Sequence, residues 1–180
     1  RITGPQYMTA GMPDGGSCHP RDNIAMRWLA QEYDLGYDLF NSVMLAREVQ
    51  AKNMADAIVL QAKAHNMECI IVGKAYKVDV GYIQGSGSVL VGHYVEEQGV
   101  HLHYYDIHTG DEGDLYQSDK PAVYLLAHNF GKISEKNTTN SVIIPDGSVV
   151  IDPWRQYQNE NCTVIHFGNT RINDTQNKIQ

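Results

Sequence analysis

The spacing of apolar residues divides the chain into a helical first part and a strand-rich remainder. Residues 20–33 carry apolar side chains at helical spacing, and Gly36 follows as glycine commonly follows a helix end. Residues 38–64 continue the helical pattern with many alanines, methionines and other strong helix formers. We therefore expect two consecutive helices. The stripe that includes Met54 and Ile58 predicts a core or helix–helix contact rather than a cofactor-binding surface.

Beyond residue 66 the pattern changes to short apolar runs, which are typical of strands buried on both faces. Residues 68–72 and 100–105 are two such runs, separated by a glycine- and serine-rich loop (81–88) and a helical segment that ends before Gly99. Strand, helix and strand in this order form a βαβ unit, so the two strands should be parallel. Three more strands are predicted, over residues 122–127, 148–151 and 163–167.

The predicted fold class is therefore α/β, a Rossmann-like parallel sheet flanked by helices and preceded by a helical segment. We place the boundary between a helical part (1–65) and a sheet domain (66–180) where the periodicity changes. Residues 1–19 are rich in glycine, proline and threonine and predict an extended loop. Residues 106–119 include Asp111, Glu112 and Asp114 and predict a solvated acidic loop.

Composition narrows the class of partner. The 180 residues carry a net charge of −7 without a basic cluster, which excludes a typical nucleic-acid-binding surface. No apolar run approaches the roughly 18 residues of a membrane span. Three cysteines in no framework spacing favour a reducing, cytoplasmic compartment. We therefore interpret the Asn-X-Ser/Thr triplets as chance matches, at Asn137, Asn161 and Asn173.

The strongest candidate for chemistry is the octet Gly-Gly-Ser-Cys-His-Pro-Arg-Asp at residues 15–22. Pro20 suits the first position of a helix, which would place Cys18 at the helix N-terminus, where the dipole favours a thiolate. Asp22 would then lie in the first turn, beside the sulfur, as a base for a covalent catalyst. From the residues alone, an ordinary turn followed by a small buried cysteine is the other open interpretation.

The octet resembles the active-site cysteine motif of the UDP-glucose/GDP-mannose 6-dehydrogenase family, Gly-Gly-Ser-Cys-Phe-Pro-Lys-Asp. Gly-Lys-Ala-Tyr-Lys at 73–77 resembles the family's Gly-Leu-Ala-Phe-Lys at the start of its nucleotide-sugar-binding domain. Val-His-Leu-His-Tyr-Tyr-Asp at 100–106 resembles the family's next strand, which also ends in aspartate. Because order and spacing agree, the resemblance covers nearly the whole chain.

The resemblance implies an NAD-dependent oxidoreductase of polysaccharide biosynthesis that converts a UDP-sugar, UDP-glucose by expectation, to the uronic acid through a cysteine thiohemiacetal and thioester. It makes Cys18 and Asp22 catalytic and puts Cys18 and Arg21 beside NAD. The substrate contacts it implies are Arg1, Tyr7, Met8, Gly11, Gly15, Gly16, Tyr76, Lys77 and Arg155. On their own, Lys77 and Arg155 are equally consistent with solvated surface cations.

The chain departs from the family at informative positions. The family's Thr-Asp-Asp-X-Arg-Glu-Ser run corresponds to residues 80–86 here, so Gln84 replaces an arginine that helps bind NAD. Arg21 replaces a lysine, and His19 replaces an aromatic residue after the cysteine. Arg155 ends the sequence Asp-Pro-Trp-Arg, which resembles the family's Asp-Gly-Arg but has one residue inserted before the arginine. These changes concern cofactor affinity and substrate identity more than the type of reaction.

The resemblance also implies a larger protein. The family's NAD-binding domain and long central helix would precede Arg1, so we expect a C-terminal half that is inactive alone and a whole enzyme that is at least a homodimer. The stripe at Met54 and Ile58 is a candidate surface for that assembly.

One other function remains open, a catalytically inactive module for nucleotide-sugar binding and assembly. A cysteine hydrolase lacks support, because no histidine has a recognisable partner geometry.

Four histidines are candidate metal ligands. His101 and His103 alternate on a predicted strand and so share one face, a spacing that can bind zinc, with His93 and His128 as candidate partners. No acidic or cysteine ligand stands at a recognisable interval. We therefore interpret these histidines as structural and predict no metal site.

Overall fold

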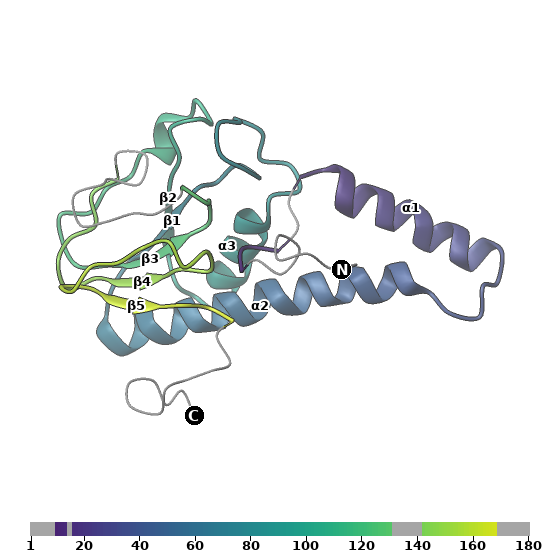
Figure 1. Ribbon diagram of the computed structural model, residues 1–180, viewed down its shortest axis with the longest axis horizontal. Coiled ribbons are helices and arrows are strands. Elements are labelled where there is room, and N and C mark those ends of the chain that lie inside the picture. The colour runs from purple at the N-terminus through teal and green to yellow at the C-terminus, as the bar shows by residue number, and fades with distance from the viewer. Residues whose placement is uncertain (1–9, 14–15, 131–141, 169–180) are drawn as a thin grey trace, which may run out of the picture.

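A five-stranded parallel sheet forms the centre of the computed structural model, which describes residues 10–13, 16–130 and 142–168. The strands are β1 (Cys69–Val72), β2 (Leu102–Tyr105), β3 (Val123–Leu126), β4 (Val149–Ile151) and β5 (Thr163–Ile165). Their spatial order is β2-β1-β3-β4-β5, and every neighbouring pair is parallel (Figure 1). This confirms the predicted fold class, and each strand lies inside its predicted range.

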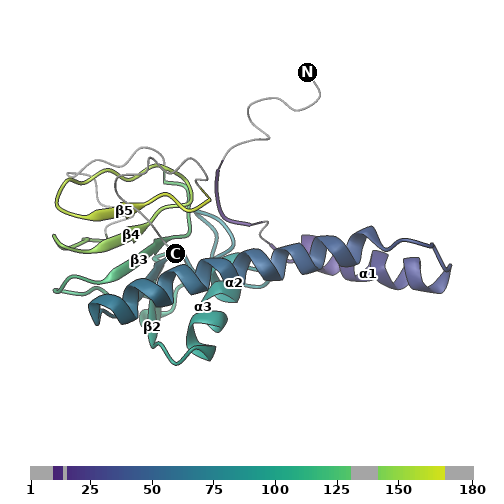
Figure 2. The same ribbon diagram turned by 90° about the horizontal axis from the view of Figure 1, so that it is seen from below.

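Two long helices form a hairpin that extends past the sheet. Helix α1 (Cys18–Glu32) and helix α2 (Leu39–His65) run side by side in opposite directions, and the hairpin tip projects away from the strands (Figures 1 and 2). The Asp38 side chain caps α2 by accepting a hydrogen bond from the Asn41 N–H at 2.8 Å. Asn66 ends the helix in the left-handed conformation.

The C-terminal half of α2 and helix α3 (Gly87–Glu97) pack on one face of the sheet. Met54 and Ile58 are buried there against strand residues such as Ile71. The core interpretation of their stripe is therefore right, and the expectation that these two residues form an assembly surface is wrong. The opposite face of the sheet is covered by loop residues that include Tyr157 and Val142.

Two helix boundaries differ from the prediction. Helix α1 begins at Cys18 with Ser17 as its N-cap, so Pro20 is the third helical residue rather than the first. Proline is tolerated there because the first four N–H groups of a helix have no partner within the helix. Asp22 consequently lies beyond the first turn, which holds no acidic residue. At the other end of α1, Asp34 (φ 46°) adopts the left-handed conformation instead of Gly36.

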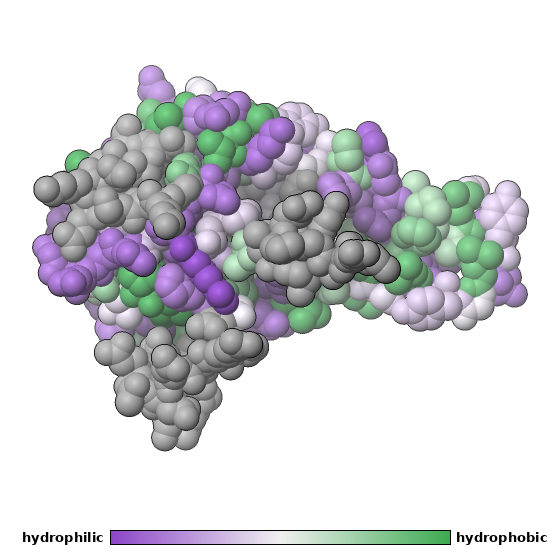
Figure 3. All heavy atoms as spheres, in the orientation of Figure 1, coloured by the Kyte–Doolittle hydropathy of each residue, from purple (hydrophilic) through white to green (hydrophobic). Residues whose placement is uncertain are grey.

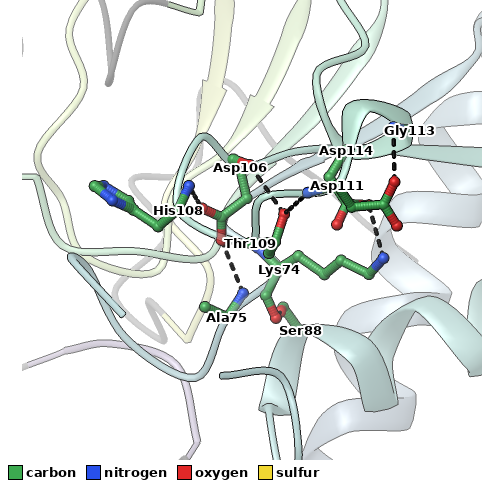
Figure 4. A network of polar contacts seen from close by, with 9 residues as sticks. All are labelled: Lys74, Ala75, Ser88, Asp106, His108, Thr109, Asp111, Gly113 and Asp114. Carbon is green, nitrogen blue, oxygen red and sulfur yellow. Dashed lines mark hydrogen bonds and ion pairs between the residues drawn. The ribbon is translucent and has the colours of Figure 1, made fainter. Parts of the chain in front are cut away.

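The segment after β2 is in part the solvated acidic loop that composition predicts, since Asp111 and Glu112 are exposed. It contains a short 3-10 helix, Glu112–Asp114, and the side chains of Asp106 and Asp114 are both buried. Asp106 Oδ2 accepts hydrogen bonds from the backbone N–H groups of Lys74 and Ala75, both at 2.8 Å. Asp114 Oδ1 lies 2.7 Å from Lys74 Nζ (Figure 4). Burial is tolerated because both carboxylates are paired with donors.

Gly73 lies directly after β1 with φ +100°, under the ring of His128 from the end of β3. A Cβ placed on Gly73 would be 2.5 Å from His128 Cγ, closer than non-bonded carbon atoms approach. His128 Nε2 lies 2.8 Å from the Ala75 carbonyl oxygen, so the ring also holds the next part of the chain. Because Gly73 has no side chain, the His128 ring, which follows β3, can pack against the start of the loop that follows β1.

We expect Gly73→Ala to destabilise the protein by about 2–4 kcal/mol, because backbone strain and overpacking against His128 add together. Gly99→Ala is the matched control, since Gly99 also has positive φ (+76°) but nothing lies within 4 Å of an added Cβ. Urea denaturation followed by circular dichroism measures both variants. Equal losses of stability in the two variants would contradict a specific contact between residue 73 and His128.

Candidate functional site

Cys18 lies at the start of α1, exposed, in a pocket where two segments of the chain meet. The pocket has a volume of about 410 Å³ and is lined by Gly16, Ser17, Cys18, His19, Tyr76, Val80 and Tyr82. It therefore combines the octet with the loop between β1 and α3. The N-cap residue Ser17 makes no side-chain capping bond, and free N–H groups at a helix N-terminus favour an anion nearby.

The loop that follows β1 is fixed at Ala75, immediately before Tyr76. The Ala75 N–H donates to Asp106, and its carbonyl oxygen accepts from Ser86 Oγ at 3.3 Å in addition to its contact with His128. The Tyr76 N–H donates to the Tyr82 carbonyl at 3.1 Å, and the two rings meet edge to face. The aromatic wall of the pocket is therefore held by strands β1, β2 and β3 together.

Gly16 connects this wall to the cysteine. It has φ +89°, and a Cβ on it would lie 3.1 Å from the Tyr76 ring. Its N–H donates to the Gly85 carbonyl at 3.2 Å. Only a residue without a side chain fits between the loop and the first turn of α1, and this close approach sets the distance between Tyr76 and Cys18.

Asp22 and Arg21 form an exposed ion pair next to the pocket. Arg21 Nε donates to Asp22 Oδ1 at 2.8 Å, and the side chains are 69% and 63% exposed. The hydrogen bond from Arg21 holds the pKa of the Asp22 carboxyl below its ordinary value, so the group is ionised at neutral pH. Asp22 stands four residues after Cys18 on the same helix, which places both on one face. It does not itself line the pocket.

The predicted substrate contacts fall in different places. Lys77 is exposed, with Nζ 5.4 Å from the centre of the Tyr76 ring, next to the pocket wall. Arg155 follows β4, exposed and with φ 58°. Gly11 packs directly on the ring of Trp154, the neighbour of Arg155. The structure thus brings Gly16 and Tyr76 to Cys18 and Gly11 toward Arg155. The remaining positions, Arg1, Tyr7, Met8 and Gly15, lie outside the described residues.

His103 on β2 and His101 just before it have aromatic neighbours. The His103 ring stacks on Tyr116 with 3.6 Å between ring centres, and the His101 ring meets it edge to face. His103 Nε2 lies 3.9 Å from Glu68 Oε2. Within residues 10–13, 16–130 and 142–168, no group of three His, Cys, Asp or Glu side chains is arranged to hold a metal ion.

Three residues that sequence reasoning missed hold the site together: Asp106, His128 and Arg47. Asp106 was visible as the aspartate directly after β2, and His128 as a polar residue shortly after a buried strand. Arg47 lies in α2, where it is 9% exposed, and its Nη2 donates to the Gly85 carbonyl at 3.3 Å. The helical pattern of α2 gives no sign of that contact, which depends on how α2 crosses the loop.

The sheet domain does not fit a dinucleotide in the usual manner. A dinucleotide-binding βα turn carries Gly-X-Gly-X-X-Gly, and an acidic residue at the end of the second strand binds ribose. The β1–α3 loop lacks that motif, and its counterpart acid, Asp106, is buried on the N–H groups of Lys74 and Ala75. Cys18 and Arg21, which the resemblance puts beside NAD, are exposed at the start of α1.

No family model matches the chain. Among curated proteins it is similar to UDP-glucose 6-dehydrogenase of Mus musculus, 27% identical over 124 residues that cover 67% of this chain and 25% of that protein. It is also similar to UDP-glucose 6-dehydrogenase of Rickettsia conorii, 22% identical over 188 aligned positions that cover 98% of this chain and 41% of that protein. The chain therefore spans between a quarter and two fifths of these relatives.

Two solved structures share the fold. One is GDP-mannose dehydrogenase of Pseudomonas aeruginosa in a ternary complex, with a TM-score of 0.62, 16% identity and coverage of 89% of this chain and 41% of that one. The other is UDP-D-ManNAc dehydrogenase of Pyrococcus horikoshii, with a TM-score of 0.55, 15% identity and coverage of 87% and 39%.

The class of the protein follows from these findings: a Rossmann-like parallel α/β domain joined to a helical hairpin whose first turn carries a cysteine. Within this class the chain is similar in sequence to UDP-glucose 6-dehydrogenases and in fold to two nucleotide-sugar dehydrogenases, enzymes of the group that its motifs predict. No helix in the described part of the chain has the length and apolar character needed to cross a membrane.

We expect iodoacetamide to modify Cys18 at least about tenfold faster than Cys69 or Cys162 at neutral pH, because only thiolates react and access is required. Burial raises the pKa of the Cys69 thiol to about 12, so it stays protonated at pH 7. Cys162 is partly buried against Tyr157 and the Pro145 carbonyl. Mass spectrometry of the folded protein reads each cysteine, and similar rates for all three in urea provide the control. A Cys18 rate no higher than the others would contradict an activated thiol.

Proposed function

We propose that the chain is the thiol-bearing and nucleotide-sugar-binding part of an NAD-dependent nucleotide-sugar 6-dehydrogenase, with a UDP-sugar, and UDP-glucose first, as substrate. The observation that carries the proposal is the pocket in which Cys18 and Tyr76 lie together, although they come from separate segments of the chain. The curated relatives named above are UDP-glucose 6-dehydrogenases, which supports the choice of sugar nucleotide. The pocket lies near the carboxyl ends of β1 and β3, where strand order reverses and where parallel sheets bind ligands.

Cys18 has a defined part in the proposed reaction. The alcohol carbon of the sugar loses a hydride and its hydroxyl loses a proton, which gives an aldehyde, and the Cys18 thiol adds across the carbonyl to form a thiohemiacetal. Loss of a second hydride from this carbon and of a proton from its hydroxyl gives a thioester. Water then breaks the carbon–sulfur bond, which releases the carboxylic acid and restores the thiol. The covalent bond holds a reactive aldehyde until the second oxidation.

When bound, NAD would supply the hydride acceptor for both oxidations, one NAD molecule for each. Because Asp106 is occupied by backbone N–H groups, we assign this chain a limited part in holding the cofactor, through Cys18 and Arg21. The main cofactor contacts are then supplied by another part of the whole protein, and the 180-residue chain alone is expected to bind nucleotide sugar without turnover.

Asp22 is the proposed base for the hydrolytic step. Its Oδ1 accepts from Arg21 Nε, which leaves Oδ2 outside that bond. Since the Arg21 hydrogen bond lowers the pKa of Asp22, the carboxylate is ionised and can orient or deprotonate a water that approaches the thioester. His19, which lines the pocket beside the sulfur, is a second group able to move a proton there.

The alternative is a nucleotide-sugar-binding module without catalysis. Gln84, in place of the arginine that the resemblance implies for NAD, favours it. The octet with Cys18 and Asp22 favours the enzyme. Turnover by the whole protein separates the two functions.

In the whole protein, Cys18→Ser should lower the rate of UDP-glucose oxidation to the acid by about 10³-fold or more, since a serine hydroxyl without a dedicated base is a weak nucleophile. UDP-glucose affinity should stay within about threefold, because one atom at the pocket edge changes. NADH formation and calorimetric titration measure the two quantities. Lys77→Ala is the contrasting variant, expected to weaken affinity. Oxidation that survives Cys18→Ser, or a wild-type protein that binds the nucleotide sugar without oxidising it, would contradict the proposed mechanism.

We further propose that the whole protein is at least a homodimer and that the helical hairpin takes part in assembly. Large apolar side chains are exposed along it, and hydrophobic residues are visible at its tip (Figure 3). They are Ile24, Met26, Trp28, Tyr33, Leu35, Tyr37, Leu39, Val43, Leu45 and Val49. A surface of this kind is typical of a protein–protein contact.

Leu45→Lys combined with Val49→Lys should raise the dimer dissociation constant of the whole protein by about tenfold or more, because the two positions share one face of α2. Leu60→Lys is the matched control, an exposed leucine on the same helix beside the sheet. Light scattering across a concentration series measures the mass. A monomer mass for the wild-type protein, or equal effects of both changes, would contradict this assembly.

A further inference from the structure

Arg47 is a buried cation at the junction between the cysteine segment and the β1–α3 loop. It is the one charged residue among those that α2 buries, with 9% of its surface exposed. Its Nη2 donates to the Gly85 carbonyl at 3.3 Å, and Glu48 Oε1 lies 3.8 Å from Nη1. Glu48 also accepts a hydrogen bond from the Tyr94 hydroxyl at 2.6 Å. A guanidinium remains charged under all ordinary conditions, so burying it costs free energy that these contacts offset.

The Gly85 carbonyl joins three parts of the fold. It accepts from Arg47 in α2 and from the Gly16 N–H, two residues before the cysteine. Gly85 has φ +71°, and a Cβ on it would be 2.5 Å from the Gly16 carbonyl oxygen. The loop and the cysteine segment therefore touch through backbone atoms. Any movement of the Gly85 peptide moves Gly16 and the N-cap residue Ser17 with it.

Arg47 places a positive charge next to Gln84, the position where the resemblance implies an arginine. The residue before Gly85 is a neutral, exposed glutamine where the resemblance implies an arginine. Arg47 brings a guanidinium to the adjoining peptide from a different element, the helix α2. A cation at this point adds to the helix N-terminus in favouring an anion close to the start of α1.

We propose that Arg47 is a positioning residue for Cys18. Through the Gly85 carbonyl, its guanidinium fixes the segment that begins α1, and it supplies at this junction the positive charge that residue 84 lacks. The inference concerns the order and reactivity of the thiol segment. That Arg47 matters for catalysis rests on the proposed function. The test of the positioning role does not require turnover.

The test compares Arg47→Met, which removes charge and donors at similar length, with Arg47→Lys, which keeps charge and a donor. Hydrogen exchange of the Gly16 amide and the iodoacetamide rate of Cys18 are measured in the 180-residue chain, with the amides of Ile71 and Leu125 as reference for the sheet. We expect Arg47→Met to speed Gly16 exchange by about tenfold and to slow Cys18 alkylation by about threefold or more, while the sheet amides are unchanged. Arg47→Lys should recover at least half of each effect on a logarithmic scale.

Three outcomes would overturn the inference: no change in either readout, equal effects of Met and Lys, or changes at Gly16 no larger than those at Ile71 and Leu125. If Arg47→Met loses the protection of the sheet, Arg47→Gln, which leaves a hydrogen-bonding side chain in place, is measured with the same expected and contrary outcomes. Failure of the proposed function would appear separately, as absent UDP-glucose oxidation in a whole protein whose Gly16 exchange still responds to Arg47.

Discussion

The Asp106 carboxylate, buried on the N–H groups of Lys74 and Ala75, is the interaction on which the candidate site depends. It joins the end of β2 to the start of the loop that follows β1. The pair formed by Lys74 and Asp114 strengthens the same connection, and His128 holds the Ala75 carbonyl from β3. A loop at the edge of a sheet would ordinarily be mobile, yet here its first peptide groups are fixed by side chains from two neighbouring strands. Asp106, the acid in these contacts, stands where a dinucleotide-binding sheet has the acidic residue that binds the ribose.

The order imposed at Ala75 extends to the thiol through close backbone contacts. Tyr76, the next residue, forms the pocket wall on which Gly16 lies, and Gly85 closes the same loop against the cysteine segment. Glycine at both positions removes the side chains that would separate the segments. Helix α2 completes the arrangement, because its buried half covers the sheet while Arg47 reaches the loop. The sheet, the hairpin and residues 16–22 thus form one connected scaffold around an exposed sulfur.

Most of the fold could be predicted from the sequence, since strands such as Cys69–Val72 are apolar on both faces and α2 has a continuous helical pattern with strong helix formers. The wrong predictions are those in which residue type alone was used to predict burial or helix position. Asp106 and Asp114 look like loop acids until the N–H groups and the lysine that they bind are known. Pro20 is as compatible with the third helical position as with the first, and the difference moves Asp22 out of the first turn. Arg47 could not be predicted, because its role depends on a contact between elements remote in the sequence.

The central claim is that the octet and the β1–α3 loop form a single nucleotide-sugar site beside Cys18. Titration of the isotope-labelled chain with UDP-glucose, followed by amide chemical shifts, tests this claim most directly. The account predicts that shifts concentrate in residues 16–19 and 74–86, together with Ala127 and His128 at the switch point between β1 and β3. Shifts confined to the pocket at the opposite edge of the sheet, lined by residues such as Glu68, Gln117 and Lys120, would contradict it. So would a titration that leaves the amides of Gly16, Cys18 and Tyr76 unchanged while UDP-glucose binds elsewhere.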